Sequence, residues 1–306
     1  MRVGLLFPGQ GSQHPGMFDR FVDDPAAADV FEEASDILGY DARTRNVFAE
    51  RGSTVDVQIA LLVCGVASAR LLAANGVEAR AVAGHSVGTF AAAVTAGALA
   101  LADAVRVVLE RATAMETLFA GGYGMAAIVG LREAAVRSIV AAGAELGEQA
   151  YIANANGPTQ FVLAGKNDAL DRALVRARAA GARRADRLDV AVPSHCALLA
   201  PVQDRLESVL AGIEVRTPRI AYVGGVGARI LRDARSVRAD LAAGVAHEVR
   251  WCDALRTLVE LDTTLLIEAV PGRVLTDLAH AAFPSVRAVS LEESSIRSLR
   301  ALAAAL

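Results

Sequence analysis

The chain has 306 residues, enough for one large domain that carries a smaller inserted one. Hydrophobic residues make up 54% of the chain and charged residues 21%, a balance that is typical of folded α/β proteins and excludes a disordered chain. The net charge is −3 and the basic residues are scattered, so the composition argues against a nucleic-acid partner.

Composition also bears on the compartment and on metals. The 3 cysteines are odd in number and far apart in the sequence, which predicts neither a disulfide framework nor a metal site. The apolar run at the amino terminus is too short for the core of a signal peptide. Residues 56–73 approach the length of a membrane span, but Asp56 and Arg70 interrupt them, so we expect a buried helix there. These features predict a cytoplasmic protein that does not contact a membrane.

The first predicted element is a short apolar strand at 3–7, which ends in Pro-Gly and leads into a glycine-rich loop at 9–13. Ligand sites favour the loops at such strand ends. Helices are predicted at 25–38 and 56–74, the second of them closed by Asn-Gly. A second apolar strand is predicted at 77–83.

The second strand runs directly into a Gly-x-Ser-x-Gly pattern at 84–88, and helices are predicted after it at 89–98 and 100–118. Between a strand and a helix, this pattern is typical of a strained turn that lifts a serine hydroxyl clear of the sheet. The alternative is a glycine-rich turn whose serine only caps a helix. The strand-to-helix position favours Ser86 as a nucleophile.

A serine nucleophile needs a base near neutral pH, and an imidazole is the commonest one. His195 lies just past a predicted strand and before a helix, where its side chain can reach a site at the strand ends. His85 is next to the serine, but adjacent residues on such a turn point apart. His14, His247 and His280 fit surface or packing roles. We therefore predict that His195 is the base.

A change of rhythm after a Gly-Gly pair at 121–122 marks a second unit. Strand, helix, strand, strand, helix and strand are predicted in turn at 125–129, 135–142, 151–154, 160–164, 168–180 and 185–192. This order predicts a ferredoxin-like α+β subdomain inserted at 123–191. The remainder, residues 1–122 and 192–306, is expected to form a large α/β-hydrolase-like domain with a short parallel sheet.

Six motifs then occur along the chain in a fixed order: FPGQGSQ at 7–13, GHSVG at 84–88, AGAL at 96–99, an arginine at 111 with Met115 close behind, NANGPTQ at 154–160 and VPSHC at 192–196. Together they resemble the malonyl-CoA:acyl-carrier-protein transacylase family over nearly the whole chain.

The resemblance implies roles for individual residues. Ser86 would accept the acyl group and His195 would act as its general base. The backbone N–H groups of Gln10 and Val87 would form the oxyanion hole, and Arg111 would clamp the free malonyl carboxylate. Three further positions are implied: side chains that line the substrate site at Gln58 and Asn156, and a backbone carbonyl that orients the histidine at Gly244.

Some residues depart from the usual pattern of the family. Thr89 replaces the acid that usually follows GHS-x-G, the segment before Trp251 is His-Glu-Val-Arg at 247–250, and the late E-x-G-P-G motif becomes Glu-Ala-Val-Pro-Gly at 268–272. The first and last of these resemble the branch that contains the epsilon subunit of malonate decarboxylase. That subunit loads malonyl onto the carrier subunit of its own complex.

The expected activity is therefore transfer of malonyl from malonyl-CoA to an acyl carrier protein by a ping-pong acyl-serine mechanism, without a bound cofactor. The acceptor would be the carrier subunit of malonate decarboxylase, or else a carrier of fatty-acid or polyketide synthesis. A serine thioesterase or esterase is the alternative from another class, although no Asp or Glu is clearly placed as a third triad member. A non-catalytic scaffold subunit is a third hypothesis, which the intact serine and histidine disfavour.

Overall fold

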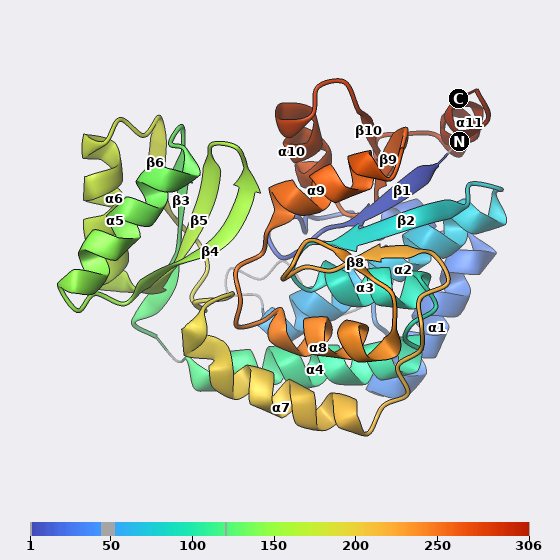
Figure 1. Cartoon of the computed structure of the whole chain (residues 1–306). Coiled ribbons are helices and arrows are strands. Elements are labelled where there is room, and N and C mark those ends of the chain that lie inside the picture. Colours follow the sequence, from blue (N-terminus) through green and yellow to red (C-terminus); the bar gives the residue numbers. More distant parts are fainter. Residues whose placement is uncertain (1, 44–52, 120, 306) are drawn as a thin grey trace.

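A mostly parallel β-sheet forms the centre of the larger part of the molecule (Figure 1). The computed structural model describes residues 2–43, 53–119 and 121–305. Within this part of the chain, the strands of the sheet lie in the order β10-β9-β1-β2-β7-β8, and only β8 runs antiparallel to its neighbour. Their bounds are β1 Val3–Phe7, β2 Ala79–Gly84, β7 Ala221–Val223, β8 Ile230–Leu231, β9 Leu265–Glu268 and β10 Arg287–Ser290. The mixed α/β fold with a parallel sheet that the sequence predicts is thus confirmed.

Helices cover both faces of this sheet, because successive side chains of its buried strands point to opposite sides. Leu5 and Phe7 point into the larger apolar cluster, whereas Leu6 points into the cluster on the other face. The larger cluster is built with α1 Pro25–Leu38, α2 Thr54–Ala74, α3 Gly88–Thr95, α4 Leu101–Leu118, α7 Ala200–Ala211, α8 Ala234–Ala243 and α11 Ile296–Ala304. The other cluster is built with α9 Trp251–Glu260 and α10 Val274–Ala282.

The long apolar helix predicted at 56–74 is α2. Its first turn is capped by Ser53, whose hydroxyl accepts the N–H of Val55 at 3.1 Å. Helix α2 is long and apolar enough to cross a membrane, and it is the one helix among the described residues that meets this test of length and composition. However, 83% of its apolar window is buried inside the protein, as in a core helix. The expectation of a buried helix is confirmed.

A second, antiparallel sheet forms a smaller unit beside the first (Figure 1). Its strands lie in the order β4-β5-β3-β6. The elements are β3 Tyr123–Val129, α5 Glu133–Glu145, β4 Ala150–Gly157, β5 Gln160–Lys166, α6 Asn167–Ala179 and β6 Arg184–Leu188. Helices α5 and α6 pack on one face, and the other face places Met125 and Ala153 in an apolar cluster with Cys196. The predicted order of elements is observed, although the last strand ends at Leu188 instead of extending to 192.

The register of the central strands brings two glycine-rich loops together. Phe7 at the end of β1 is paired with Gly84 at the end of β2, and the N–H of His85 donates to the Phe7 carbonyl at 2.9 Å. Because β1 and β2 are parallel, the loops at 8–13 and 85–88 leave the sheet at the same edge. The candidate site lies at that edge, between the two sheets.

Candidate active site

Ser86 occupies a strained turn between β2 and α3. Its φ is 56°, in the left-handed region that residues other than glycine rarely adopt. Two glycines make room for this turn: a Cβ added to Gly88 would lie 2.2 Å from the Phe7 carbonyl oxygen, and one added to Gly84 would lie 2.2 Å from the carbonyl carbon of Gly88. No larger residue fits at either position, so the glycines of the pattern follow from the close packing of the turn against β1.

The imidazole of His195 lies between the serine and a backbone carbonyl. Its Nε2 atom is 2.7 Å from the Ser86 hydroxyl oxygen, and its Nδ1 atom is 2.6 Å from the carbonyl oxygen of Gly244. A carbonyl only accepts hydrogen bonds, so Nδ1 carries the proton and Nε2 is left as an acceptor for the serine proton. The backbone N–H of His195 also donates to the carbonyl of Val245 at 2.8 Å, which holds the residue from the same segment.

The electrostatics of the site keep His195 uncharged. The pKa of His195 is lowered to about 3 by burial and, secondarily, by the nearby Arg111 and His85. A neutral imidazole whose free nitrogen faces a serine hydroxyl is the form that can remove a proton. Within the described part of the chain, the arrangement provides a nucleophile and a base without an acidic third member, and the Gly244 carbonyl orients the ring instead.

Arg111, on α4, is buried beside the serine with only 2% of its surface exposed. Its Nη2 atom lies 3.3 Å from the Ser86 hydroxyl oxygen, and its Nη1 atom donates to the side-chain oxygen of Gln58. Among the residues that the structure describes, no carboxylate forms an ion pair with it. Burial lowers the pKa of Arg111 to about 10, well within the range where it stays charged at neutral pH. A buried guanidinium without a carboxylate suits an anionic group next to the serine.

These groups share a small, partly open cavity between the two units. The cavity has a volume of about 70 Å³ and is lined by Gln10, Gln58, His85, Ser86, Val87, Met115, Met125, Asn154, Val190, Ser194 and His195. Arg111 reaches it through its contact with Ser86. The structure thus brings together the serine, the histidine, the arginine and Gln58, which the sequence predicted to meet.

Gln10 and Val87 line the same cavity. Neither backbone N–H group donates to an acceptor within the ranges that the structure describes, although Val87 is buried and most buried N–H groups in proteins are paired. Val87 immediately precedes α3, whose amino-terminal end faces the serine turn. Both N–H groups are therefore available to an oxygen that develops negative charge in the cavity.

The predicted substrate-lining residue Asn156 lies one step behind the cavity. Its side-chain Oδ1 pairs with Nε2 of His85 at 3.0 Å, and Asn154, rather than Asn156, lines the cavity. Asn154 was not among the predicted site residues, although both asparagines belong to the Asn-Ala-Asn run of β4 and residues two apart on a strand share a face. His85 packs edge-on against Trp251 of the large unit, with ring centroids 5.5 Å apart, so the ring is held between Trp251 and the asparagines of β4.

Comparison with known proteins agrees with this geometry. The family model described as "Acyl transferase domain" matches residues 5–296. The malonyl CoA-acyl carrier protein transacylase of Escherichia coli (strain K12) is 38% identical, with 100% of this chain and 99% of that protein covered. The crystal structure of an acyl-carrier-protein S-malonyltransferase from Burkholderia pseudomallei superposes with a TM-score of 0.91 at 33% identity, covering 99% of each chain.

A further solved structure is similar over 98% of both chains, with a TM-score of 0.91 and 34% identity. It is described as a type II PKS acyl-carrier protein in complex with its malonyl-transacylase. The matches cover the serine turn, the histidine loop and the whole small unit. The chain therefore belongs to the acyl transferase family that includes the malonyl CoA-acyl carrier protein transacylases, and it is an acyltransferase.

Proposed function

We propose that the chain is a malonyl-CoA:acyl-carrier-protein S-malonyltransferase that works through an ester on Ser86. The observation that carries the proposal is the convergence of the Ser86 hydroxyl, the His195 imidazole and the Arg111 guanidinium on one cavity. The names of the relatives support it, because they describe malonyl transfer to an acyl carrier protein.

In the first half-reaction, Nε2 of His195 takes the proton of the Ser86 hydroxyl as its oxygen attacks the thioester carbonyl carbon of malonyl-CoA. The carbonyl oxygen becomes an oxyanion, which the N–H groups of Gln10 and Val87 stabilise. The carbon–sulfur bond then breaks, and the imidazolium returns its proton to the departing CoA sulfur. Malonyl remains as an ester on Ser86.

In the second half-reaction, the thiol of the carrier protein takes the place of CoA. His195 removes the thiol proton, the sulfur attacks the ester carbonyl, and the Ser86 oxygen leaves with that proton. Every proton step passes through one nitrogen, so the enzyme returns to its starting state. The chemistry needs malonyl-CoA as donor and no resident cofactor or metal.

Selectivity for malonyl would come from Arg111. The terminal carboxylate of malonyl would pair with the buried guanidinium, which the Gln58 side chain already holds in place. An acetyl group would leave the guanidinium unpaired, at a cost of about 1–3 kcal/mol, so acetyl-CoA should be the poorer donor. Asn156 would act behind His85 and not on the substrate itself.

Two carrier proteins are candidates for the acceptor of the malonyl group. Thr89 after the serine turn and the Val-Pro-Gly run at 270–272 favour the carrier subunit of malonate decarboxylase. The alternative is a carrier of fatty-acid or polyketide synthesis, which the complex of a polyketide acyl-carrier protein with its malonyl-transacylase favours. The two acceptors differ in their contacts at the mouth of the site and share one chemistry.

We also propose how the chain divides into two structural units. The strand order β4-β5-β3-β6 supports a ferredoxin-like subdomain at 123–191, inserted in an α/β-hydrolase-like domain made of 1–122 and 192–306.

A cytoplasmic location is proposed because malonyl-CoA is the donor. The 3 cysteines, all unpaired and buried, are consistent with a reducing compartment.

One assay separates the transferase from a hydrolase. The protein is incubated with malonyl-CoA alone, with the carrier subunit of malonate decarboxylase, and with a fatty-acid acyl carrier protein, while free malonate and malonyl-carrier are measured. A transferase produces malonyl-carrier and little malonate, and the faster carrier identifies the acceptor. Rapid malonate release that no carrier accelerates would instead identify a thioesterase.

A further inference from the structure

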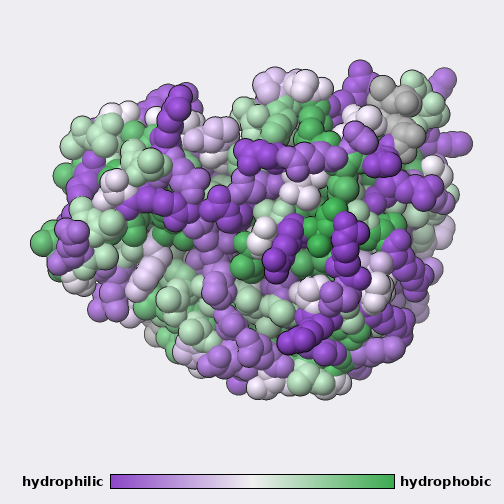
Figure 2. All heavy atoms as spheres, viewed as in Figure 1, coloured by the Kyte–Doolittle hydropathy of each residue, from purple (hydrophilic) through white to green (hydrophobic). Residues whose placement is uncertain are grey.

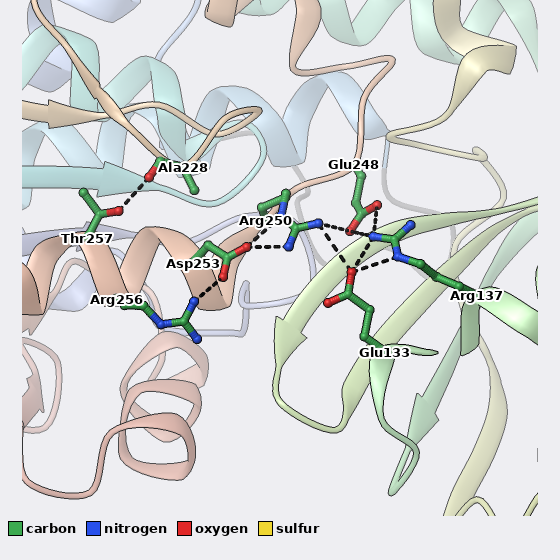
Figure 3. Close-up of polar contacts among 8 residues, drawn as sticks. All are labelled: Glu133, Arg137, Ala228, Glu248, Arg250, Asp253, Arg256 and Thr257. Carbon is green, nitrogen blue, oxygen red and sulfur yellow. Dashed lines mark hydrogen bonds and ion pairs between the residues drawn. The ribbon is translucent and has the colours of Figure 1, made fainter. Parts of the chain in front are cut away.

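Alternating charges cross the junction between the small unit and the large one (Figure 3). Hydrophilic residues also gather on the surface over this junction (Figure 2). Arg137 and Arg250 each pair with both Glu133 and Glu248, and the chain of ion pairs continues from Arg250 through Asp253 to Arg256. We call this set the junction cluster. Its 3 arginines and 3 carboxylates balance, so the cluster can form without net charge.

The cluster joins α5 to the segment at 244–250. Arg137 of α5 donates to both carboxylate oxygens of Glu248, at 3.2 and 3.1 Å. Arg250 reaches back to Glu133 of α5 at 3.4 Å and is held by Asp253 at 2.7 Å. Glu248 and Arg250 flank Val249 in an extended segment, so their side chains share a face, and Figure 3 shows both directed toward α5.

The same segment also holds the catalytic imidazole. Gly244 accepts from Nδ1 of His195, and Val245 accepts from its backbone N–H. Further along, Val249 forms a parallel bridge to β4, in which its N–H donates to Ala153 at 2.8 Å and its carbonyl accepts from Ala155 at 2.9 Å. One short segment therefore contacts His195 at its start and the small unit at its end.

We infer that Glu248 is a positioning residue: by holding Arg137 it docks the small unit on the 244–250 segment and fixes the carbonyl that orients His195. This inference rests on the proposed function, because it assigns a task within the same serine–histidine chemistry. Glu248 is the member best placed for it, since its side chain is only 20% exposed and it adjoins Val249. Glu248 is mostly buried and pairs with two arginines, so its effect on the geometry of the base has to be measured separately from its effect on stability.

The cavity beside His195 supports the same assignment. Arg137 and Glu248 line a space of about 370 Å³ that also borders His195, Cys196 and Tyr151. A loosened junction would let the histidine loop move into this space. The ion pair thus lies on the wall of an open pocket behind the imidazole, which itself is only 3% exposed.

The test compares Glu248→Gln, Arg137→Met and the double variant with the full-length wild type. The matched control is Glu33→Gln, which removes a carboxylate 40% exposed from an ion pair with Arg70 between α1 and α2, far from the junction in the fold. The first readout is the rate at which phenylmethanesulfonyl fluoride modifies Ser86, because that rate depends on His195 and not on malonyl. The second is the kcat and KM for malonyl transfer.

We expect Glu248→Gln to lower both the Ser86 modification rate and kcat about three- to tenfold, with KM for malonyl-CoA changed less than about twofold. The double variant should be slowed less than the product of the two single effects, because the single variants both remove the Arg137–Glu248 pair. Raising the salt concentration should slow the wild type toward the variant rate and leave the variant unchanged. Amide hydrogen exchange at Val249 and Ala155 should be faster in the variants, and the control should match the wild type.

Three results would overturn the inference: an unchanged Ser86 modification rate in Glu248→Gln, effects of the single variants that multiply in the double variant, or a change confined to KM. A lower melting temperature without a change in rate would show a purely structural role. If the wild type reacts with the sulfonyl fluoride but forms no malonyl ester, the proposed function fails while the positioning role is still measured. The two claims can therefore fail separately.

Discussion

The Nε2 atom of His195 lies 2.7 Å from the hydroxyl oxygen of Ser86, although the two residues are 109 positions apart in the chain. Both residues have a positive φ, 56° for Ser86 and 63° for His195. Each is therefore held in a conformation that its own backbone disfavours, and the surrounding contacts must maintain it. The glycines at 84 and 88 do this for the serine, and the Gly244–Val245 carbonyls do it for the histidine.

The buried guanidinium leads to a prediction about donor choice. Arg111→Ala should reduce the ratio of malonyl to acetyl transfer roughly tenfold or more, because the carboxylate of malonyl loses its partner and acetyl loses nothing. The measurement is competition between malonyl-CoA and acetyl-CoA for the enzyme. Arg106→Ala is the control, since Arg106 lies on the same helix with its side chain 61% exposed. Equal ratios in the wild type and Arg111→Ala would refute the clamp.

The lowered pKa of His195 gives the pH dependence its direction. Burial and the neighbouring charges lower the pKa of His195 from 6.5 to about 3, so its base form persists on the acid side of neutrality. The rate of Ser86 modification by a sulfonyl fluoride should therefore show no inflection near pH 6.5 and should decline only at more acid pH, while circular dichroism checks that the protein is folded. Arg111→Met should raise the midpoint, because a positive neighbour is lost. A wild-type midpoint near pH 6.5 would contradict the account.

The same shift affects stability. A folded-state pKa below the unfolded value means that the unfolded chain binds the proton more tightly, so protonation of His195 favours unfolding. The contribution of His195 to the free energy of unfolding should become increasingly unfavourable as the pH falls from 6.5 toward about 3. His195→Gln should therefore flatten the acid side of the stability profile in urea unfolding. An unchanged profile would show that His195 does not carry this linkage.

Glu268 leads to a prediction about folding rather than catalysis. Its side chain is 0% exposed, and its two oxygens accept the N–H groups of Leu275 and Thr276 at the start of α10, at 3.0 and 2.7 Å. Glu268→Ala would leave both donors buried without acceptors, which should cost about 2–4 kcal/mol of unfolding free energy. Urea unfolding at fixed pH measures this. A loss of less than about 0.5 kcal/mol would show that water or local movement satisfies the two groups.

The pKa of Glu268 adds a pH test to this prediction. Burial raises it from 4.5 to about 7, so the stabilising contribution of this group is full below pH 4.5 and is lost as the pH rises through about 7. The stability difference between the wild type and Glu268→Ala should therefore shrink as the pH rises across that window. A difference that grows with pH would reverse the assigned sign.

Much of the central sheet and its site could be predicted from local patterns. The run at 3–7 is a strand and the run at 56–74 is a helix because continuous apolar residues of those lengths can be buried only in that way. The serine turn is equally local, since the glycines around Ser86 are required by contacts within a few residues of it and with the neighbouring strand.

Features that depend on packing between distant segments were harder to predict. Asn154 and Asn156 look equivalent in the sequence and both side chains lie near Nε2 of His85, but only Asn154 lines the cavity, a difference that sequence spacing does not give. Strand β8, Ile230–Leu231, carries too few residues to show a period. The junction cluster pairs Arg137 with Glu248, 111 residues apart, and no spacing rule connects such positions.

The central claim is that Ser86 carries the malonyl group between donor and carrier. The most direct measurement is the intact-protein mass after brief mixing with malonyl-CoA and no carrier, for the wild type and for Ser86→Ala. The account predicts that the wild type gains one malonyl group, which is lost again when the carrier thiol is added, and that Ser86→Ala gains none. A wild type without the added mass, or a Ser86→Ala variant that gains it equally, would contradict the account.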